Sequence, residues 1–393
     1  MLQLHAGETV GIDLGDGVEM KEILEWIAQN PVDLVIVGPD EHLALGIVDA
    51  VEKLGVPIFG PTQAASEIEW SKAFAKKFMQ EENIPTAKYE TFSDSTKAKE
   101  YIKSQVFPIV IKASGLAFGK GVIIAQDISE AEKALDEIMN NKIFGSAGDE
   151  IIIEEYLLGK EISIHAFCDG ETAVLFPPAQ DHKRIFDNDE GPNTGGMGTF
   201  APVPWVTEEQ MKEIEEKVVI PTLKALQKRD RPFKGILFPG IMITKEGPKV
   251  IEFNARFGDP ETQSYMRILE TDLLDILFAC IEARLSEQKI QWSTEIACCI
   301  VAASDGYPGQ YEKGKIISGL ESYQNEITIF HVATQESNGD ILTNGGRVLG
   351  ITATGNHLKV SLHKAYEAID SISFEGMQYR KDIGMKSMEI GIP

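Results

Sequence analysis

The sequence predicts a multidomain protein of mixed α/β and α+β class. Its 393 residues are enough for about two to four packed units. Helix and strand patterns alternate near the N-terminus, whereas the chain beyond about Gln291 is rich in short strand patterns and glycine turns. Hydrophobic residues make up 43% and charged residues 25%, which is typical of a soluble globular enzyme.

The N-terminal region has the pattern of α/β winding. The spacing of apolar residues predicts an amphipathic helix over Met20–Gln29 and another around Leu43–Leu54. Val32–Val37 is a continuous apolar run, as expected for a strand buried on both faces of a parallel sheet, and Pro57–Phe59 is a short second strand. Gly38–Leu45 then lies at the carboxyl end of the first strand, where such sheets bind ligands.

Helices and strands also alternate in the middle of the chain. Between Ser66 and Glu82, the aromatic residues Trp70, Phe74 and Phe78 recur every fourth position, which predicts one helix with a buried stripe. The elements predicted next are a helix at Ser95–Ser104, strands at Phe107–Lys112 and Val122–Ala125, a helix at Ser129–Asn140, and strands at Glu150–Glu155 and Glu161–Phe167.

A polar, glycine-rich loop is expected at Gln180–Gly198. Thr207–Lys228 is predicted to be a helix, because its opening T-E-E-Q is a capping-box pattern. Two strands follow at Gly235–Thr244 and Lys249–Phe253, joined by a turn at Lys245–Pro248. The short strands beyond them are expected to form a separate small domain.

The charge balance is strongly acidic. Lysine and arginine total 37 against 61 acidic residues, which gives a formal net charge of −24. A field of this sign repels a phosphate backbone, so we expect no nucleic-acid partner. Any site for a phosphorylated substrate must therefore concentrate cations locally, and the informative basic residues are those close to glycines.

Cysteine usage and the start of the chain favour the cytoplasm. The cysteines match neither a zinc site nor a disulfide framework, so we expect buried, reduced thiols at Cys168, Cys280, Cys298 and Cys299. No stretch has the length of a membrane-spanning helix. The opening MLQLHAGETV lacks the basic start and long apolar core of a signal peptide. We therefore expect a cytoplasmic protein without a membrane partner.

A glycine-rich turn follows the predicted strand at Phe107–Lys112, in the run K-A-S-G-L-A-F-G-K-G-V. Its glycines, Gly115, Gly119 and Gly121, allow backbone N–H groups to approach a polyphosphate closely, and Lys112 and Lys120 add positive charge. The pattern is neither a P-loop nor a dinucleotide fingerprint, because a strand follows the glycines. The alternative interpretation is a tight hairpin with exposed lysines.

An acidic segment, E-E-Y-L-L-G-K-E, lies between two predicted strands at Glu154–Glu161. Free backbone groups in such a connection can hydrogen-bond an adenine edge, and a carboxylate just beyond it can accept ribose hydroxyls. An ordinary acidic turn is the alternative.

The run V-I-E-F-N-A-R-F-G-D-P-E places several polar residues at one strand end. Glu252 and Asn254 point to the same face, because side chains alternate along a strand. A carboxylate and an amide oxygen side by side suit magnesium, which is often shared with substrate phosphates. Arg256 continues this face and offers a planar guanidinium to a phosphate or developing anion. The alternative is a buried salt-bridge network.

A basic cluster precedes a second glycine-rich stretch between Asp181 and Gly198, in D-H-K-R and G-P-N-T-G-G-M-G. Lys183 and Arg184 stand out in an otherwise acidic chain, and the paired glycines free the backbone to wrap a ligand. A merely mobile loop is the alternative. His182 fits a structural hydrogen-bonding role as well as a proton carrier.

Together, these features resemble the ATP-grasp superfamily and, more narrowly, the phosphoribosylamine–glycine ligase (glycinamide ribonucleotide synthetase) family. The resemblance runs from about Val32 to the C-terminus. Its most specific pieces are D-H-K-R, G-P-N-T-G-G-M-G, E-F-N-A-R-F-G-D-P-E-T-Q, G-Y-P-G-Q-Y-E-K-G and G-G-R-V-L-G. It implies a truncated N-terminal α/β domain at 1–60, a two-lobed ATP-grasp core at 61–290 with a small lobe at about 87–155, and a β-rich C-terminal domain at 291–393.

The resemblance implies a role for each matched residue. ATP would bind to Lys72, Lys112, Gly115, Gly119, Lys120, Gly121, Glu154, Leu157 and Glu161, with Glu154 and the Leu157 backbone at adenine and Glu161 at the ribose. Glu252 and Asn254 would ligate magnesium or manganese. The catalytic candidates are Lys183, Arg184 and Arg256. The substrate-binding candidates are Asp181, Thr194, Gly195, Gly196 and Asp259.

The implied reaction belongs to de novo purine synthesis. The glycine carboxylate attacks the γ-phosphate of ATP, giving glycyl phosphate and ADP, and the amine of 5-phosphoribosylamine then displaces phosphate. Such chemistry depends on positioning and charge neutralisation more than on a protein nucleophile. The family also leads us to expect a monomer or weak homo-oligomer.

The chain departs from the family pattern at its start. The family begins with a strand and a G-G-R-E-H-A turn, and about 30 residues, the size of a βαβ motif, are expected to be absent here. Smaller departures are Asp40 for Glu, His42 for Pro and Ser114 for Asp. The alternatives are therefore a truncated ATP-binding remnant with little activity, or an ATP-grasp ligase or carboxylase for another acid. A Rossmann dehydrogenase is disfavoured, because no strand–GxGxxG–helix unit is present.

Overall fold

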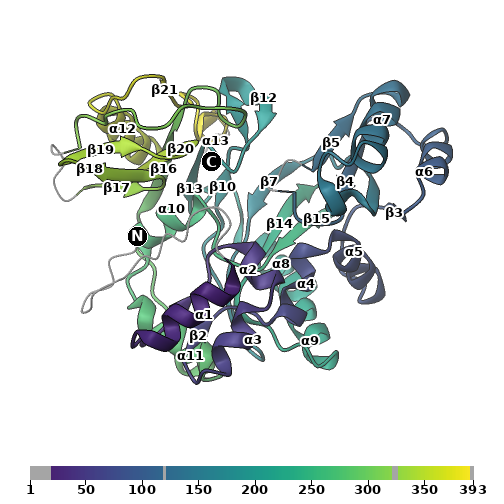
Figure 1. Cartoon of the computed structure of the whole chain (residues 1–393), viewed down its shortest axis with the longest axis horizontal. Helices are drawn as coiled ribbons and strands as arrows, with labels where there is room; N and C mark the ends of the chain where they lie inside the picture. The colour runs from purple at the N-terminus through teal and green to yellow at the C-terminus, as the bar shows by residue number, and fades with distance from the viewer. Residues whose placement is uncertain (1–18, 118–120, 321–325, 390–393) are drawn as a thin grey trace.

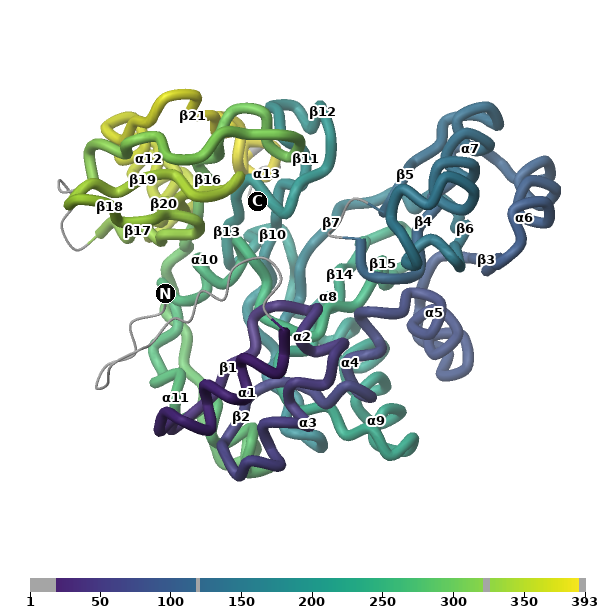
Figure 2. Tube along the Cα trace, in the orientation of Figure 1, coloured from purple at the N-terminus to yellow at the C-terminus, as the bar shows by residue number. Residues whose placement is uncertain are grey.

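The computed structural model describes residues 19–117, 121–320 and 326–389. Figures 1 and 2 show residues 87–155 projecting on one side of the molecule and the C-terminal region on the other, with the N-terminal helices below. We expected the first strand and glycine-rich turn of the family to be absent from the start of the chain. This prediction falls on residues 1–18, which lie outside the described residues. Within the described ranges, no helix is long and apolar enough to cross a membrane.

The N-terminal region has the predicted α/β winding. Helix α1 (Met20–Gln29) is confirmed, and two short parallel strands follow, β1 (Val35–Ile36) and β2 (Ile58–Phe59). The prediction of one helix over Leu43–Leu54 was wrong, because the chain forms α2 (Asp40–Ala44) and α3 (Ile47–Glu52). Gly46 separates them with a φ of 83°, a left-handed conformation that glycine adopts without steric cost.

The predicted helix at Ser66–Glu82 is also two helices, α4 (Gln63–Trp70) and α5 (Lys72–Glu81). Ser71 between them is extended, with φ −123° and ψ 99°, and its side chain caps α5 by accepting a hydrogen bond from the Phe74 N–H. The spacing of Trp70, Phe74 and Phe78 suggested one helix, but Trp70 belongs to α4 and the other two belong to α5. The rings of Phe74 and Phe78 stack with centroids 6.0 Å apart. This break places Lys72 at the first turn of α5.

Residues 87–155 form a small lobe of one antiparallel sheet and two helices. The sheet order is β3-β6-β4-β5, with β3 at Tyr89–Phe92, β4 at Ile109–Ala113, β5 at Val122–Ala125 and β6 at Ile151–Glu155. Helices α6 (Ser95–Ile102) and α7 (Ile128–Leu135) cover it, and α7 runs into a π-helical turn at Asp136–Asn140. Alanine, isoleucine and leucine side chains from both layers form a buried core of their own.

The central sheet is built on a long hairpin, which the sequence predicted. Strands β14 (Lys234–Thr244) and β15 (Gly247–Asn254) pair antiparallel, with a bulge where Gly240 faces Glu252 but Ile241 faces Val250. The expected strand Glu161–Phe167 is two strands, β7 (Lys160–Ser163) and β8 (Ala166–Asp169), which pair with different parts of β14. Strand β9 (Ala173–Leu175) completes the sheet beside β8.

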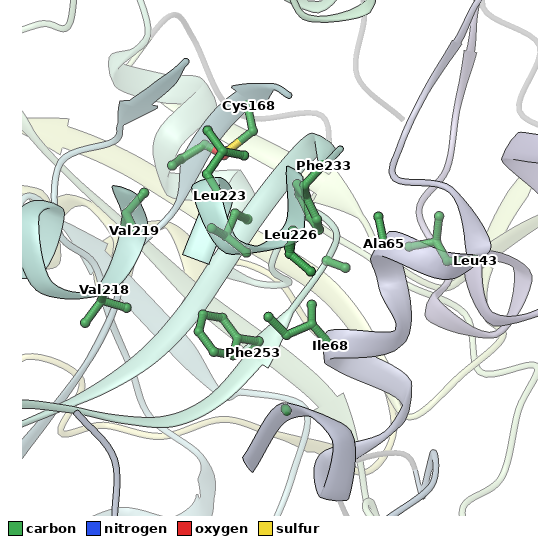
Figure 3. Packing of buried hydrophobic residues seen from close by; sticks show 14 of the residues in the cluster. Leu43, Ala65, Ile68, Cys168, Val218, Val219, Leu223, Leu226, Phe233 and Phe253 are labelled. Atoms are coloured by element: carbon green, nitrogen blue, oxygen red, sulfur yellow. The ribbon is translucent and has the colours of Figure 1, made fainter. Parts of the chain in front are cut away.

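Helices on this sheet connect it to the N-terminal region. The capping box at Thr207 is confirmed and opens α8 (Glu208–Ile214), which continues through a π-helical turn into α9 (Ile220–Lys228). Figure 3 shows side chains of α9 close to Phe253 of β15 and Ile68 of α4. This shared core fixes the N-terminal helices against the strand that carries the predicted metal ligands.

The prediction of a long loop at Gln180–Gly198 was wrong. The segment contains β10 (Gln180–Asp181), β11 (Arg184–Phe186) and β12 (Glu190–Asn193), and it leads into β13 (Gly198–Ala201). Strands β11 and β12 form a hairpin of their own. Glycines and charged residues hid β10, β11 and β12, because these strands are short and lack alternating apolar residues, and β13 pairs with the distant strand β16.

The C-terminal region is β-rich, as predicted, but its sheet is not built from its own residues alone. The order is β10-β13-β16-β20-β17, with β21 beside β16, so strands of the central region complete it. The remaining bounds are α10 (Glu261–Ile268), α11 (Leu273–Ile281), β16 (Ile296–Ser304), β17 (Ile327–His331), β18 (Thr334–Ser337), β19 (Asp340–Thr343), β20 (Arg347–Gly355), α12 (Leu358–Ile369), β21 (Met377–Gln378) and α13 (Met385–Glu389). The four cysteines are buried and unpaired, as expected.

Arg380 ties the C-terminal segment to the β11–β12 hairpin. Its side chain is 1% exposed and donates hydrogen bonds to Asp382 (2.7 Å), Asp189 (2.9 Å) and the Arg184 carbonyl (3.1 Å).

Arg380→Met should lower the free energy of unfolding by about 1.5–3 kcal/mol, because charged hydrogen bonds are lost. Lys386→Met, which removes an exposed ion pair to Asp189, is the control and should cost less than about 1 kcal/mol. Equal losses in urea unfolding would contradict this account.

Candidate active site

One cleft of about 1040 Å³ lies where the small lobe, the β14–β15 hairpin, the end of β1 and the C-terminal region meet. The end of β1 contributes Gly38, Pro39 and Asp40, as its place in the sheet predicted. The other sequence-predicted residues that line the cleft are Lys72, Lys112, Gly121, Glu154, Leu157, Glu161, Asp181, Lys183, Arg184, Thr194, Gly195, Glu252, Asn254, Arg256 and Asp259. Gly115 and Gly196 lie outside this lining, and Gly119 and Lys120 lie outside the described residues.

Lys72 and Lys112 enter the cleft from different parts of the fold. The Lys72 N–H donates to the Ser114 carbonyl (2.9 Å), so the first turn of α5 abuts the glycine-rich turn. Ser114, which departs from the family pattern, accepts a hydrogen bond from the Ala73 N–H through its hydroxyl (3.1 Å). Lys112 extends from β4, and its Nζ donates to the Ile251 carbonyl (3.0 Å). Two lysines therefore face the strand end that carries Glu252.

Glu154 is held by two lysines. Its Oε1 lies 3.1 Å from Lys112 Nζ, and its Oε2 lies 3.1 Å from Nζ of Lys76 on α5. Any contact between this carboxylate and adenine must compete with these ion pairs. Lys76 was not predicted as a site residue, although its spacing of four from Lys72 places both side chains on one face of a helix.

Glu252 and Asn254 present oxygen atoms to the cleft. The Asn254 Nδ2 donates to the Phe238 carbonyl (3.4 Å), and its Oδ1 accepts a hydrogen bond from Arg256 (3.2 Å), which orients the amide. Burial opposes ionisation of Glu252, but the nearby cations, Lys72 and Lys112 foremost, outweigh it and lower its pKa. An ionised carboxylate beside an oriented amide oxygen fits magnesium, which prefers such hard ligands.

Arg256 is fixed by Glu69, a residue of α4 that the sequence analysis missed. Glu69 Oε1 lies 3.3 Å from the guanidinium, and Oε2 accepts a hydrogen bond from the Ala255 N–H (2.7 Å). Burial raises the pKa of Glu69 to about 7, against the opposing effect of Arg256. The N-terminal helices thus hold a cation of the cleft in place.

A second cluster of charged residues consists of Lys183, Asp181 and Glu261. The Lys183 Nζ lies 2.7 Å from Asp181 Oδ2, and the neighbouring Glu261, missed from the sequence, is 1% exposed and accepts a hydrogen bond from the Ser163 hydroxyl (2.7 Å). Burial raises the pKa of Asp181 to about 7, and Lys183 opposes this rise. Gly196 is required here, because a Cβ would lie 2.7 Å from both Asp181 carboxylate oxygens.

His182 has a structural role, which decides between the two interpretations of its sequence context. Its Nε2 accepts a hydrogen bond from the Gly384 N–H (3.1 Å), so the ring proton is on Nδ1, which donates to the Gly198 carbonyl (3.0 Å). Burial and Arg380 lower its pKa to about 4. Both nitrogens are occupied, and the neutral ring connects the residue after β10 to Gly384, which directly precedes α13.

The remaining predicted residues shape the wall toward the C-terminal region. Thr194 closes its loop by donating from its hydroxyl to the Lys183 carbonyl (2.8 Å), and Arg184 donates to the Gly191 carbonyl (2.6 Å). Arg347 donates to the Asp259 carboxylate (3.1 Å) and carbonyl (2.8 Å).

Tyr307 accepts a hydrogen bond from the Gly195 N–H (3.0 Å). Like Arg347, it was missed as a site residue, although both lie within C-terminal motifs that matched the family.

A nucleotide-sized cleft between two α+β lobes, with two lysines facing a carboxylate and an amide, defines the chain as an ATP-grasp enzyme, an ATP-dependent ligase. Phosphoribosylglycinamide synthetase domain models match along the chain: the N domain at residues 6–69, the ATP-grasp (A) domain at 70–262 and the C domain at 297–386. The chain therefore belongs to the phosphoribosylamine–glycine ligase family.

Individual relatives agree with this assignment. The chain is 48% identical over 365 residues to the phosphoribosylamine–glycine ligase of Caldanaerobacter subterraneus, covering 93% of this chain and 87% of that protein. It is similar to the crystal structure of the Thermotoga maritima phosphoribosylamine–glycine ligase, with a TM-score of 0.83, 34% identity, and coverage of 93% of this chain and 89% of that one. A biotin carboxylase from Campylobacter jejuni (TM-score 0.75, 16% identity, coverage 94% and 81%) shares the fold alone.

These matches give the truncated-remnant hypothesis no support, because the N domain model already matches from residue 6. In a bifunctional purine biosynthetic protein of Dictyostelium discoideum, the matching region is 45% identical over 398 residues and covers 49% of that protein.

The raised pKa of Glu69 predicts a pH-dependent contribution to stability. The folded protein keeps a proton there up to about pH 7, whereas the unfolded chain releases it near 4.5. This contribution is therefore fully present below 4.5 and is lost as the pH rises through 7. Glu69→Gln keeps the hydrogen-bond acceptor but cannot ionise. We expect its Tm relative to the unchanged protein to rise between about pH 5 and about pH 8. A constant difference in Tm would show that Glu69 is ionised throughout.

Proposed function

We propose that this chain ligates glycine to 5-phosphoribosylamine at the expense of ATP, forming glycinamide ribonucleotide, ADP and phosphate in purine synthesis. The supporting observation is that one cleft joins a lysine pair and oxygen ligands to a second group of cations, in a member of the ligase family. The first set suits a nucleotide polyphosphate, and the second suits the anionic groups of an acyl phosphate and a sugar phosphate.

The nucleotide end of the cleft is assigned to the small lobe and α5. Lys72 and Lys112 would hold the ATP phosphates beside Gly121, and the backbone at Leu157 would meet adenine. Glu161 lies just beyond that segment and would accept the ribose hydroxyls. Because two lysines already hold the Glu154 carboxylate, we assign the adenine edge to backbone groups rather than to this side chain.

Glu252 and Asn254 are the proposed ligands of magnesium or manganese. Two protein oxygens leave room for phosphate oxygens and water, which commonly complete magnesium coordination. The ion would neutralise charge on the ATP phosphates. Arg256, anchored by Glu69, lies beside these ligands and would stabilise the negative charge that develops during phosphoryl transfer.

The reaction then proceeds in two displacements. A glycine carboxylate oxygen bonds to the γ-phosphorus while the bond from phosphorus to the bridging oxygen breaks, so ADP leaves and glycyl phosphate remains. The amine nitrogen of phosphoribosylamine attacks the acyl carbon, inorganic phosphate departs with the former carboxylate oxygen, and the nitrogen loses a proton. Lys183, paired with Asp181, lies where it can hold the acyl phosphate between these displacements.

The amine substrate is assigned to the wall near the C-terminal region. Arg184 and Arg347 offer guanidinium groups for the ribose phosphate, and Arg347 is already oriented by Asp259. Thr194, Gly195 and Gly196 would surround the sugar. This end of the site combines the 61–290 core with the 291–393 region, and so depends on the shared sheet.

The purified chain should release ADP only when MgATP, glycine and freshly generated phosphoribosylamine are all present. Omitting each substrate in turn tests this directly in a coupled ADP assay. Turnover with another carboxylic acid in place of glycine would instead indicate a different ATP-grasp ligase, and turnover stimulated by bicarbonate would indicate a carboxylase.

Glu252→Gln should lower kcat by about 100-fold or more, because a charged ligand beside the phosphates is lost. Its dependence on magnesium concentration should also shift to higher concentrations. Glu246→Gln is the matched control, since that carboxylate lies on the same hairpin, is 77% exposed and pairs with Lys249. Equal activity of the two variants would exclude Glu252 as a metal ligand.

A further inference from the structure

Three charged side chains are almost completely buried behind the nucleotide end of the cleft. The exposed fractions of Lys76 and Glu154 are 3% and 4%, and that of Lys112 is 4%. Two cations thus share one anion in an environment where unpaired charge is costly. A single lysine would neutralise Glu154, so the second lysine needs a separate explanation.

The two lysines differ in what they face. Lys112 lines the cleft, where the proposed function places the ATP phosphates, whereas Lys76 does not line it. A phosphate group would draw Lys112 Nζ away from its present contacts with Glu154 and the Ile251 carbonyl. Without another partner, the buried Glu154 carboxylate would then be left unpaired.

Lys76 also connects the small lobe to the strand of the metal ligands. Its Nζ donates to the Thr86 hydroxyl (2.7 Å), which donates in turn to the Val250 carbonyl on β15 (2.7 Å). The Val250 N–H donates back to the Pro85 carbonyl (2.8 Å). Since Val250 lies two residues before Glu252, this network crosses the junction at which the small lobe leaves the core.

We propose that Lys76 is a positioning residue that keeps Glu154 paired and so frees Lys112 to bind a nucleotide phosphate. This inference rests on the proposed nucleotide site. It predicts an effect on ATP binding and not on the chemistry of glycine, because Lys76 does not reach the cleft. In Lys76→Met, Lys112 is the one ion-pair partner left to Glu154 among the residues that the structure describes, and ATP must break that pair to bind.

The test compares Lys76→Met with Lys77→Met, an adjacent lysine of the same helix whose side chain is 74% exposed. Calorimetric titration with MgATP and steady-state kinetics are measured on both folded variants. Lys76→Met should weaken ATP binding and raise the KM for ATP by about tenfold, which corresponds to about 1.4 kcal/mol. Its kcat and its KM for glycine should change little. Lys77→Met should match the unchanged protein.

The double variant Lys76→Met/Glu154→Gln separates this role from simple damage to the fold. With Glu154 neutral, Lys112 has no strong ion pair to break, so ATP affinity should return to within about threefold of the unchanged protein. If Lys76→Met alone does not fold, the ATP affinity of the double variant still tests the proposal.

Unchanged ATP affinity in Lys76→Met, or a tenfold loss that persists in the double variant, would overturn the proposal. Failure of the unchanged protein to bind MgATP would instead contradict the proposed function.

Discussion

The cleft depends on one constraint: a charge taken out of water needs a partner of opposite sign in a fixed position. The protein carries a net charge of −24, yet it gathers several cations at one place, and four of them have an acidic neighbour. These pairs are Lys112 with Glu154, Arg256 with Glu69, Lys183 with Asp181, and Arg347 with Asp259. The acidic partners keep the cations in place before any substrate binds, so less reorganisation is needed when phosphate groups arrive.

Two of these four pairs join regions that are far apart in the sequence. Glu69 belongs to the N-terminal helices and Arg256 to the end of β15, while Arg347 belongs to the C-terminal sheet and Asp259 to the segment before α10. The hydrophobic cores provide the rigidity behind them, because α9, β15 and α4 share one buried cluster (Figure 3). These ion pairs therefore help to hold the N-terminal helices, the central sheet and the C-terminal sheet in position around the cleft.

Much of the fold was predictable from local sequence patterns. Several of the features that were not predictable depend on contacts between residues that are distant in the sequence. The β14–β15 hairpin and the capping box follow from alternation and helix signals, whereas many of the predicted residues that line the cleft came from the resemblance of sequence motifs to a known family. The helix breaks at Gly46 and Ser71 were missed because apolar spacing continues through them. Strand β13 was missed because its partner β16 is distant in the sequence, and β10 was missed with it because β10 pairs with β13. Glu69, Lys76 and Glu261 were missed because each contacts a side chain that is distant in the sequence.

The central claim is that this cleft brings a glycine carboxylate oxygen onto the γ-phosphorus of ATP and later releases it with phosphate. The most direct measurement uses glycine labelled with ¹⁸O in both carboxylate oxygens, with mass spectrometry of the inorganic phosphate formed. The account predicts one ¹⁸O atom in each phosphate, because the oxygen that attacks phosphorus stays bonded to it when the amide forms. Unlabelled phosphate would show that water, not glycine, accepts the phosphoryl group, and would contradict the account.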